Sequence, residues 1–406
     1  MSFLISLSGM NAASADLNIT SNNIANANST GFKQSRGEFG DVFAATAHGL
    51  SNNTIGAGVR LQRVAQQFAQ GNVDYTGKSL DMALTGEGFF TLAGSNGVSY
   101  SRAGNFGADR EGYVVNPTGQ RLQVFLPNAS GDGFDTGRMA DLRLATGDAP
   151  PRATSEVSLG LNLPGNAAPP SAAPFDANDP DSYNHTTSVT VYDSLGAPHS
   201  QSMYFVRTAN PNEWQVHASI DGTAVGAPAT LQYSDTGELQ VPANGLVALP
   251  AHDPGNGAAP LVVGLDLGGS TQYGESFNVS ELVQDGHATG RLTGIEVSAT
   301  GVVTAQYTNG VSTALGQVAM TSFSNPQGLQ PLGDNGWAET FESGQPLRGA
   351  AGTSDLGMIQ GGALEASNVD LTEQLVNMIT AQRNFQANAQ MISTQDQITQ
   401  TVINIR

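Results

Sequence analysis

The C-terminal segment is the feature that most limits how this chain can fold. In residues 364–406 apolar side chains recur at steps of three and four, with no proline or glycine among them. These steps place the side chains on one face of a helix. Asp370-Leu-Thr-Glu373 and Ser367-Asn-Val-Asp370 both have the spacing of a capping box, and either would begin the helix. The predicted apolar stripe consists of Leu364, Leu371, Leu375, Met378, Phe385, Ile392 and Val402.

The N-terminal segment has the same spacing of apolar residues. Phe3, Leu7, Met10, Leu17 and Ile24 lie at helical spacing, and the turn-forming run Asn26-Ala-Asn-Ser-Thr-Gly31 follows them. Two apolar helices at opposite ends of one chain predict a helical core that is completed together by residues 1–27 and 363–406.

The outer faces of these helices indicate what they contact. They carry mainly Asn, Gln, Ser and Thr in place of the alternating Glu and Lys of an exposed helix. An amide can both donate to and accept from an identical neighbour. We therefore expect the outer faces to meet copies of the same chain. A two-helix coiled-coil stalk within a monomer would show the same periodicity.

Between the helices, short alternating runs separated by turn residues predict antiparallel β structure. We interpret residues 28–72 as an extended linker with a strand around 59–67. Residues 73–145 with 285–362 predict an inner β domain, and residues 146–284 predict an outer β domain. The expected fold is therefore multidomain, with paired, coiled-coil-like N- and C-terminal α-helices and two mainly antiparallel β domains nested between them.

The charge is strongly acidic and unevenly spread. The chain has a formal net charge of −19. Residues 146–284 contain 14 Asp and Glu but only two basic residues, Arg152 and Arg207, so this segment has a net charge of −12. Nucleic-acid binding requires a basic surface, so we expect no nucleic-acid partner. No apolar run reaches the roughly 18 residues of a membrane span, so we expect no membrane insertion. The acidic middle is expected to face water, and the near-neutral ends are expected to lie in contacts.

No motif indicates catalysis, a metal or a cofactor. The six His lie without metal-ligand spacing, and the chain has no Cys for a thiolate site or a disulfide. Asp176-Ala-Asn-Asp-Pro-Asp181 lacks the glycine and the bidentate glutamate of a calcium loop, and we interpret it as a solvated acidic loop. We predict a structural protein that is not an enzyme. The N-terminus lacks the features of a signal peptide, so export is expected without cleavage.

Both terminal motifs resemble those of bacterial flagellar rod and hook proteins. The N-terminal motif spans Ser14 to Lys33, and the C-terminal motif spans Leu364 to Asn388. The first β domain of that family is similar to two segments of this chain, residues 80–90 and 100–106. The outer domain of its hook members is similar to three others, residues 191–196, 203–206 and 212–214. The N-terminal signature residues are Asn22, Asn23, Ile24, Ala25, Asn26, Thr30, Gly31 and Phe32.

The resemblance implies an extracellular hook subunit. Such a subunit polymerises through its terminal helices into a curved, flexible tube that links rod to filament and transmits torque. The implied partners are other copies of the chain, the distal rod protein, the hook cap, the hook–filament junction protein and the flagellar type III export apparatus. Because the terminal helices lack a core of their own, we expect them to become ordered on polymerisation.

Other identities stay open at this point. A distal rod protein shares both terminal motifs but lacks so large an acidic β region. A hook–filament junction protein fits the N-terminal motif less well. An alternative of a different class is an extracellular β-rich adhesin or enzyme with a helical stalk.

Overall fold

The computed structural model describes residues 2–42, 56–95, 97–128, 133–144, 147–353 and 355–404. The chain divides into two compact units. Unit 1 comprises Met1–Ala145, Gly294–Ala305 and Thr313–Arg406, and unit 2 comprises Thr146–Thr293 and Gln306–Ser312. The outer domain predicted to end at residue 284 therefore stops before the end of unit 2. The terminal helices belong to the same compact unit as the inner β strands.

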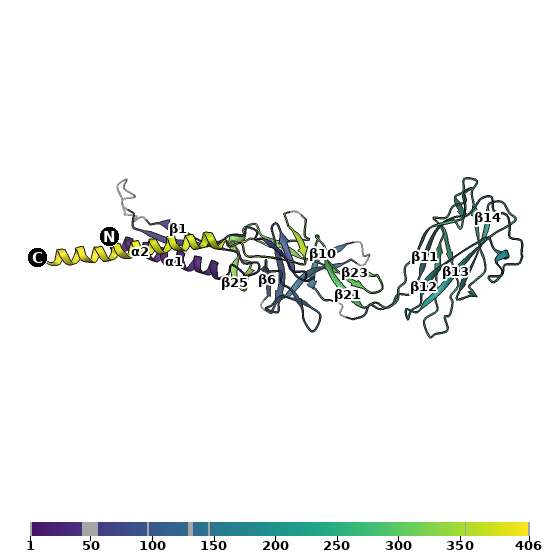
Figure 1. The fold of residues 1–406 in the computed structure, drawn as a ribbon, viewed down its shortest axis with the longest axis horizontal. Coiled ribbons are helices and arrows are strands. Elements are labelled where there is room, and N and C mark those ends of the chain that lie inside the picture. Colours follow the sequence, from purple (N-terminus) through teal and green to yellow (C-terminus); the bar gives the residue numbers. More distant parts are fainter. Residues whose placement is uncertain are drawn as a thin grey trace. The chain divides into compact units, whose positions relative to one another are not determined.

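Two long helices lie side by side in unit 1. They are α1 (Ser2–Ala25) and α2 (Leu371–Asn404), and they run antiparallel (Figure 1). Of the two predicted starts, α2 uses Asp370, whose Oδ1 accepts hydrogen bonds from the N–H groups of Thr372 at 2.8 Å and Glu373 at 3.2 Å. This N-cap satisfies donors that the first helical turn leaves unpaired.

The structure places Leu364, the first residue of the predicted stripe, before the start of the C-terminal helix. Ala363–Glu365 forms strand β29, which pairs with β3 (Val73–Tyr75) so that Leu364 lies opposite Asp74. Leu364 is therefore not part of the helical stripe. The physical reason is tertiary, because the side chain of Glu365 is fully buried in an ion cluster that holds this segment extended.

The predicted linker contains a β-hairpin. The expected strand is confirmed as β2 (Val59–Gln66), and it pairs antiparallel with β1 (Ser35–Asp41), which was not predicted. The hairpin packs on α1, where Ser8 Oγ accepts a hydrogen bond from the N–H of Val59 at 3.2 Å.

The inner β strands of unit 1 come from two separate parts of the sequence that pair with each other. In the main sheet the strand order is β21-β22-β23-β9-β5-β6-β26-β25. Off this path, β10 pairs with β9, and β24 pairs with β5. A cluster of buried apolar side chains, including Met82, Phe90 and Leu122, forms the core. The one-turn 3-10 helix η2 (Pro326–Gly328) lies in the connection after β24. The strands are β4 (Met82–Thr85), β5 (Phe89–Gly94), β6 (Gly97–Ser101), β7 (Gly107–Ala108), β8 (Val114–Val115), β9 (Arg121–Pro127), β10 (Phe134–Asp141), β21 (Leu292–Val297), β22 (Val302–Tyr307), β23 (Ser312–Val318), β24 (Met320–Ser322), β25 (Gln330–Gly333), β26 (Gly336–Ala338), β27 (Leu347–Gly349) and β28 (Met358–Gly361).

Unit 2 is a β-sandwich. One sheet has the order β12-β13-β14-β16-β17 with β15 on β14, and the other has the order β18-β19-β11-β20. Side chains of both sheets, among them Leu159, Phe205 and Trp214, share one buried apolar cluster. The one-turn 3-10 helix η1 (Pro180–Ser182) precedes β12. The strands are β11 (Glu156–Asn162), β12 (His185–Tyr192), β13 (Pro198–Arg207), β14 (Glu213–Ile220), β15 (Thr223–Ala224), β16 (Ala229–Tyr233), β17 (Leu239–Val241), β18 (Leu246–Ala248), β19 (Gly264–Asp266) and β20 (Asn278–Gln284). The predicted fold class, terminal helices with mainly antiparallel β domains between them, is confirmed.

Candidate functional site

The two terminal helices contact each other through small and amide side chains. Asn23 Nδ2 donates a hydrogen bond to Gln374 Oε1 at 3.1 Å. Gly9 lies so close to α2 that a Cβ atom there would come within 2.6 Å of Asn388 Oδ1. Such residues allow a close approach of the two backbones but bury little apolar surface. The buried residues of the helix pair include Ser6, Ala13, Thr20, Asn23, Gln374 and Ala381.

The predicted apolar stripe remains partly open in the single chain. Phe3 is 47% exposed, Leu371 46% and Leu375 51%. The remaining stripe residues are half-buried, namely Leu7, Met10, Leu17, Ile24, Met378, Phe385 and Ile392. Val402 lies in α2, but its side chain lies outside the described residues.

Apolar residues beyond the predicted stripe enlarge the open surface. Ile379 is 50% exposed and follows Leu371 and Leu375 at steps of four, so the three side chains form one ridge along α2. We call these three residues the open ridge. Leu4, Val376, Met391, Ile398 and Ile403 are also exposed. A helix of 34 residues that buries so few large side chains gains little stability within its own chain, because packing supplies most helical stability in proteins.

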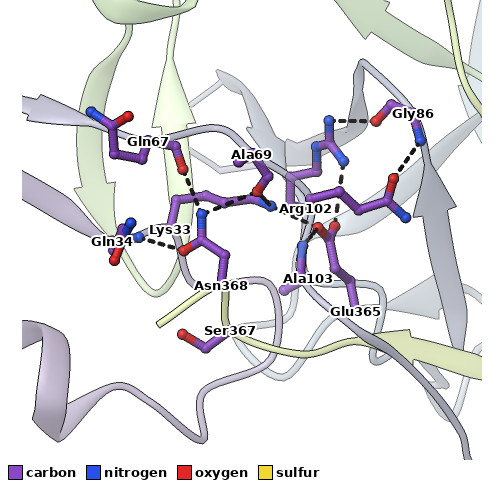
Figure 2. A network of polar contacts seen from close by, with 12 residues as sticks. Lys33, Gln34, Gln67, Ala69, Gly86, Arg102, Ala103, Glu365, Ser367 and Asn368 are labelled. Carbon is purple, nitrogen blue, oxygen red and sulfur yellow. Dashed lines mark hydrogen bonds and ion pairs between the residues drawn. The ribbon is translucent and has the colours of Figure 1, made fainter. Parts of the chain in front are cut away.

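A buried ion cluster connects the helices to the β strands of unit 1 (Figure 2). Glu365 Oε1 lies 2.6 Å from Lys33 Nζ, and Glu365 Oε2 lies 3.4 Å from Arg102 Nη1. The side chains of Lys33 and Glu365 have no exposed surface, and that of Arg102 is 4% exposed. Burial lowers the pKa of Lys33 and of Arg102, and the nearby Glu365 carboxylate opposes both shifts. The cluster joins the segment that follows α1, the segment that follows β6 and the last residue of β29.

Backbone groups complete the hydrogen bonding of this cluster. Lys33 Nζ also donates to the Ala69 carbonyl at 2.7 Å, and Arg102 Nη2 donates to the Gly86 carbonyl at 2.7 Å. The N–H of Gly71 donates to Glu365 Oε1 at 2.9 Å. Buried charges are tolerated when they are both paired and hydrogen-bonded, and this cluster meets both conditions at most of its polar atoms.

Asn368 fixes the segment that leads into α2. Its Oδ1 accepts a hydrogen bond from the N–H of Gln34 at 2.8 Å, and its Nδ2 donates to the carbonyls of Gln67 at 2.8 Å and Ala69 at 3.1 Å (Figure 2). One amide therefore links the chain before β1, the chain after β2 and the approach to α2. We refer to Lys33, Arg102, Glu365 and Asn368 with these contacts as the helix junction.

The N-terminal signature residues build the turn that leads from α1 into the helix junction. Asn23 exchanges two hydrogen bonds with the backbone of Ser35, at 2.8 and 2.9 Å. Gly31 has a φ of +67°, and a Cβ there would lie 2.5 Å from the backbone nitrogen of Ala103, so glycine is required. The N–H of Gly31 donates to the Glu365 carbonyl at 2.8 Å. The signature places Asn22, Asn23, Ile24 and Ala25 at the end of α1, and Asn26, Thr30, Gly31 and Phe32 in the turn.

Sequence reasoning missed the residues of the helix junction. Lys33, Glu365 and Asn368 lie inside the two terminal motifs, and Arg102 lies inside the segment 100–106. A signal was present at Lys33, since the N-terminal motif carries only one other charge, Asp16, whereas Glu365 is one of four charges in the C-terminal motif. Their partners could not be read from spacing, because Lys33 and Glu365 are 332 residues apart in the sequence.

Unit 2 contains a separate polar cluster around His199. His199 Nδ1 lies 2.6 Å from Asp221 Oδ2, and Nε2 lies 3.2 Å from Asp193 Oδ2. Burial alone would lower the pKa of His199, but the hydrogen bonds with both carboxylates raise it above its ordinary value. The pKa of Asp193 falls to about 2, because hydrogen bonds from Asn256, the backbone and His199 outweigh the effect of burial. This arrangement stabilises the charged histidine within the sandwich.

Within the described ranges, no three or more His, Cys, Asp or Glu side chains are grouped so that they could hold a metal ion. The described helices include none with the length and apolar character needed to cross a membrane.

Family models match the chain in four places. The models are "Flagella basal body rod protein" over residues 3–33, "Flagellar hook protein FlgE/F/G D1 domain" over 83–166, "Flagellar basal body protein FlaE D2 domain" over 162–287 and "Flagellar basal body rod FlgEFG protein C-terminal" over 360–405. Together with the paired terminal helices, these matches define the class of structural proteins that build the bacterial flagellar rod and hook.

Full-length relatives narrow the class to one family. The chain is 38% identical over 414 residues to the flagellar hook protein FlgE of Salmonella typhimurium, with 100% of both chains covered. It is 38% identical over 413 residues to that of Escherichia coli, again with 100% of both covered, and 33% identical over 416 residues to that of Rhizobium meliloti, with 98% of this chain and 97% of the relative covered. The chain belongs to the flagellar hook protein FlgE family, whose members are structural proteins and not enzymes. The expected hook resemblance is confirmed, and a distal rod protein is not favoured.

The fold resembles that of a solved hook protein. The match to the crystal structure of Helicobacter pylori FlgE2 has a TM-score of 0.54 at 16% identity and covers 72% of this chain and 100% of that chain.

Proposed function

We propose that this chain polymerises through its terminal helices into the curved, flexible tube of the flagellar hook, which links rod to filament and transmits torque. The open ridge is the observation that carries this proposal. Leu371, Leu375 and Ile379 are about half exposed in the single chain. Full burial of such a side chain is worth about 1.5–3 kcal/mol, so each leaves roughly 1 kcal/mol to be gained from a neighbouring copy.

The charge distribution supports different roles for the two units in the polymer. The helix pair is nearly neutral, and residues 146–284 carry most of the net negative charge. A repeated charge at a subunit contact would repel its copies, so we assign the helices to the inner contacts and unit 2 to the outer surface. Family membership supports contacts with the distal rod protein, the hook cap and the hook–filament junction protein at the ends of the tube. It also supports an extracellular location and type III export as an unfolded chain without a cleaved signal.

Substitution of Leu375 by Asp tests the role of the open ridge. Full-length Leu375→Asp should stay monomeric at concentrations where the wild type forms tubes, because a carboxylate would have to be buried at every repeat. Phe385→Asp should act in the same way. Assembly is measured by sedimentation and by negative-stain microscopy of the pelleted material. Leu126, which is 44% exposed on β9, offers a matched control as Leu126→Asp.

The control separates a loss of assembly from a loss of folding. We expect Leu126→Asp to assemble, and we expect Leu375→Asp to retain the wild-type thermal transitions of its β structure. If Leu375→Asp and Phe385→Asp form tubes at the wild-type concentration, the helical stripe is not the polymerisation surface and the proposal is wrong.

We assign bending to unit 2, whose acidic surfaces would slide past those of neighbouring copies, and removal of unit 2 tests this role. The chain enters and leaves unit 2 side by side, since the N–H of Ala149 donates to the carbonyl of Gly290 at 2.7 Å. A short turn can therefore replace residues 150–289 without straining the rest of the chain. We expect the shortened chain to polymerise into straighter tubes, visible by electron microscopy. Complete loss of assembly would contradict the assignment of unit 2 to bending.

A further inference from the structure

The helix pair carries only four charged side chains in α1 and α2 as the structure describes them, and two of the four have no partner there. Glu373 lies in the first turn of α2, where a helix end favours negative charge, and Asp396 Oδ2 accepts a hydrogen bond from Gln400 Nε2 at 3.2 Å. Asp16 of α1 and Arg383 of α2 form no ion pair or side-chain hydrogen bond with any residue that the structure describes. One anion and one cation are therefore left uncompensated on two otherwise nearly neutral helices.

Asp16 lies in a polar hollow between α1, α2 and the start of β1. The hollow has a volume of about 350 Å³, is open to solvent, and is lined by the carboxylates of Asp16 and Glu373 together with Arg36. Arg36 Nη2 already lies 3.5 Å from Glu38 Oε1. Burial raises the pKa of Asp16 above its ordinary value. We call the space around Asp16 and Glu373 the anionic hollow; a further cation would stabilise its charged carboxylates.

Arg383 of the same chain does not fill the anionic hollow, because it lies on the far side of α2. Gln374 and Ala381 are buried and lie seven residues apart, so they share the face of α2 that contacts α1. Arg383 follows Ala381 by two residues, roughly 200° around the helix, and it is exposed. Asp16 follows Gly9 by seven residues and therefore lies on the face of α1 that approaches α2.

The two unpaired charges lie at nearly the same level of the helix pair. Gly9 lies against Asn388. Because the helices are antiparallel, Asp16, seven residues after Gly9, lies opposite position 381, seven residues before Asn388. Arg383 is two residues from that position, roughly 3 Å along the helix axis. A neighbouring copy displaced sideways would therefore present its Arg383 close to the height of the anionic hollow.

We propose that Arg383 of one copy enters the anionic hollow of a neighbouring copy and pairs with Asp16 there. This inference rests on the proposed function, which packs the helices of each copy against those of other copies. The cation and the hollow that receives it lie on different surfaces of the helix pair. Each copy can therefore make one contact of each kind, and such a contact can repeat along a polymer. Pairing opposite charges also avoids the repulsion that either charge alone would repeat at every copy.

Exchange of the two charges in the full-length chain tests the contact. Asp16→Arg and Arg383→Asp should each raise the critical concentration for tube formation about tenfold, because each brings like charges together at every contact. The chain that carries both substitutions should assemble near the wild-type concentration. An equimolar mixture of the two single variants should do so as well, since each variant supplies the charge that the other needs. Arg60→Asp, which reverses another exposed cation of unit 1, is the matched control and should assemble like the wild type.

Neutral variants keep the test decisive if a reversed charge disturbs the helix pair itself. Asp16→Asn and Arg383→Gln each remove one charge and should each raise the critical concentration severalfold. Because both remove the same interaction, the two substitutions together should raise it no more than either does alone. If the two effects multiply, the groups act independently and the pairing is wrong.

The outcomes separate this inference from the proposed function. If Leu375→Asp fails to assemble while Asp16→Arg and Arg383→Asp form tubes at the wild-type concentration, the charge pair is absent but the helical polymer stands. If all three variants assemble normally, both ideas are wrong. If the doubly substituted chain assembles but the mixture does not, the pair forms within one chain and the contact between copies is overturned.

Discussion

Replacing Glu365 by Gln should destabilise unit 1 far more than an equivalent change on its surface. The substitution keeps the shape of the side chain but removes its negative charge. Lys33 and Arg102 would then remain as two buried cations beside a neutral amide. Because both cations are almost completely buried, water cannot replace the lost carboxylate.

The size of the effect follows from the burial of the pair. Removing one partner of a buried ion pair costs about 3–5 kcal/mol, since the other charge is left uncompensated. A glutamine oxygen can still accept a hydrogen bond from Lys33, so we expect a value of about 3 kcal/mol. For a unit of this size, 1 kcal/mol shifts the melting temperature by about 2–4 °C. The thermal transition of unit 1 should therefore fall by about 6–12 °C.

Differential scanning calorimetry of the full-length monomer provides the assay. The transition of unit 2 serves as an internal reference, because the substitution lies outside it. Glu38→Gln is the matched control: Glu38 Oε2 lies 2.7 Å from Arg63 Nε, but the two side chains are 30% and 58% exposed. Exposed pairs contribute about 0–1 kcal/mol, so this control should shift unit 1 by no more than about 3 °C.

A combined variant distinguishes the cost of an unpaired charge from the worth of the cluster. Replacing Lys33 and Arg102 by Met and Glu365 by Leu removes all three charges together, and it should recover most of the stability lost in Glu365→Gln. If Glu365→Gln shifts unit 1 no more than Glu38→Gln does, the helix junction is not held by its ion cluster and the reasoning is refuted.

Two further predictions concern pH and order. The pKa of His199 is raised by its contacts with Asp193 and Asp221. Its ion pairs therefore contribute their full stabilisation of unit 2 when the pH is below 6.5, the ordinary histidine pKa. That stabilisation is lost as the pH rises through the raised pKa. Melting of unit 2 across a range of about pH 6–9 should show this decline, and His199→Gln should flatten it; a flat wild-type profile would contradict the prediction. In dilute monomer the backbone amides of residues 2–25 and 371–404 should exchange hydrogen rapidly and become protected in tubes; strong protection in the monomer would show that the helices do not depend on neighbours.

The helices were predictable from the sequence, but the face that each turns toward the other was not. Periodicity alone identified both segments, because apolar steps of three and four match the turn of an α-helix and do not match the alternation of a strand. The apolar stripe suggested that Leu375 would lie in the contact between the helices. The structure buries the adjacent Gln374 instead and leaves Leu375 half exposed. The two positions differ by one residue, about 100° around the helix. The apolar pattern favoured Leu375 and could not indicate that an amide would face the other helix.

Strand β1 was missed for a different reason. Its sequence, Ser35-Arg-Gly-Glu-Phe-Gly-Asp41, contains two glycines and no β-branched residue, so its intrinsic tendency to form a strand is low. Pairing with β2 and packing on α1 supply the missing stability. The extended conformation of Leu364 was missed for a related reason, because residues 363–369 contain no local breaker. Pairing of β29 with β3 and the buried contacts of Glu365 and Asn368 keep them out of the helix.

The helix junction and the helix faces are stabilised in opposite ways, and this contrast bears on how a hook can bend while transmitting torque. The junction is complete within one chain, and disrupting it requires exposing or isolating a buried charge at a cost of several kcal/mol. In the proposed polymer the helix faces gain further stability from other copies, through half-exposed side chains worth about 1 kcal/mol each. A torque on the helices therefore passes into the β strands of unit 1 without deforming the junction. Bending is then left to contacts away from the junction and the helices, and we infer that it occurs where unit 2 meets neighbouring copies, which the replacement of residues 150–289 tests.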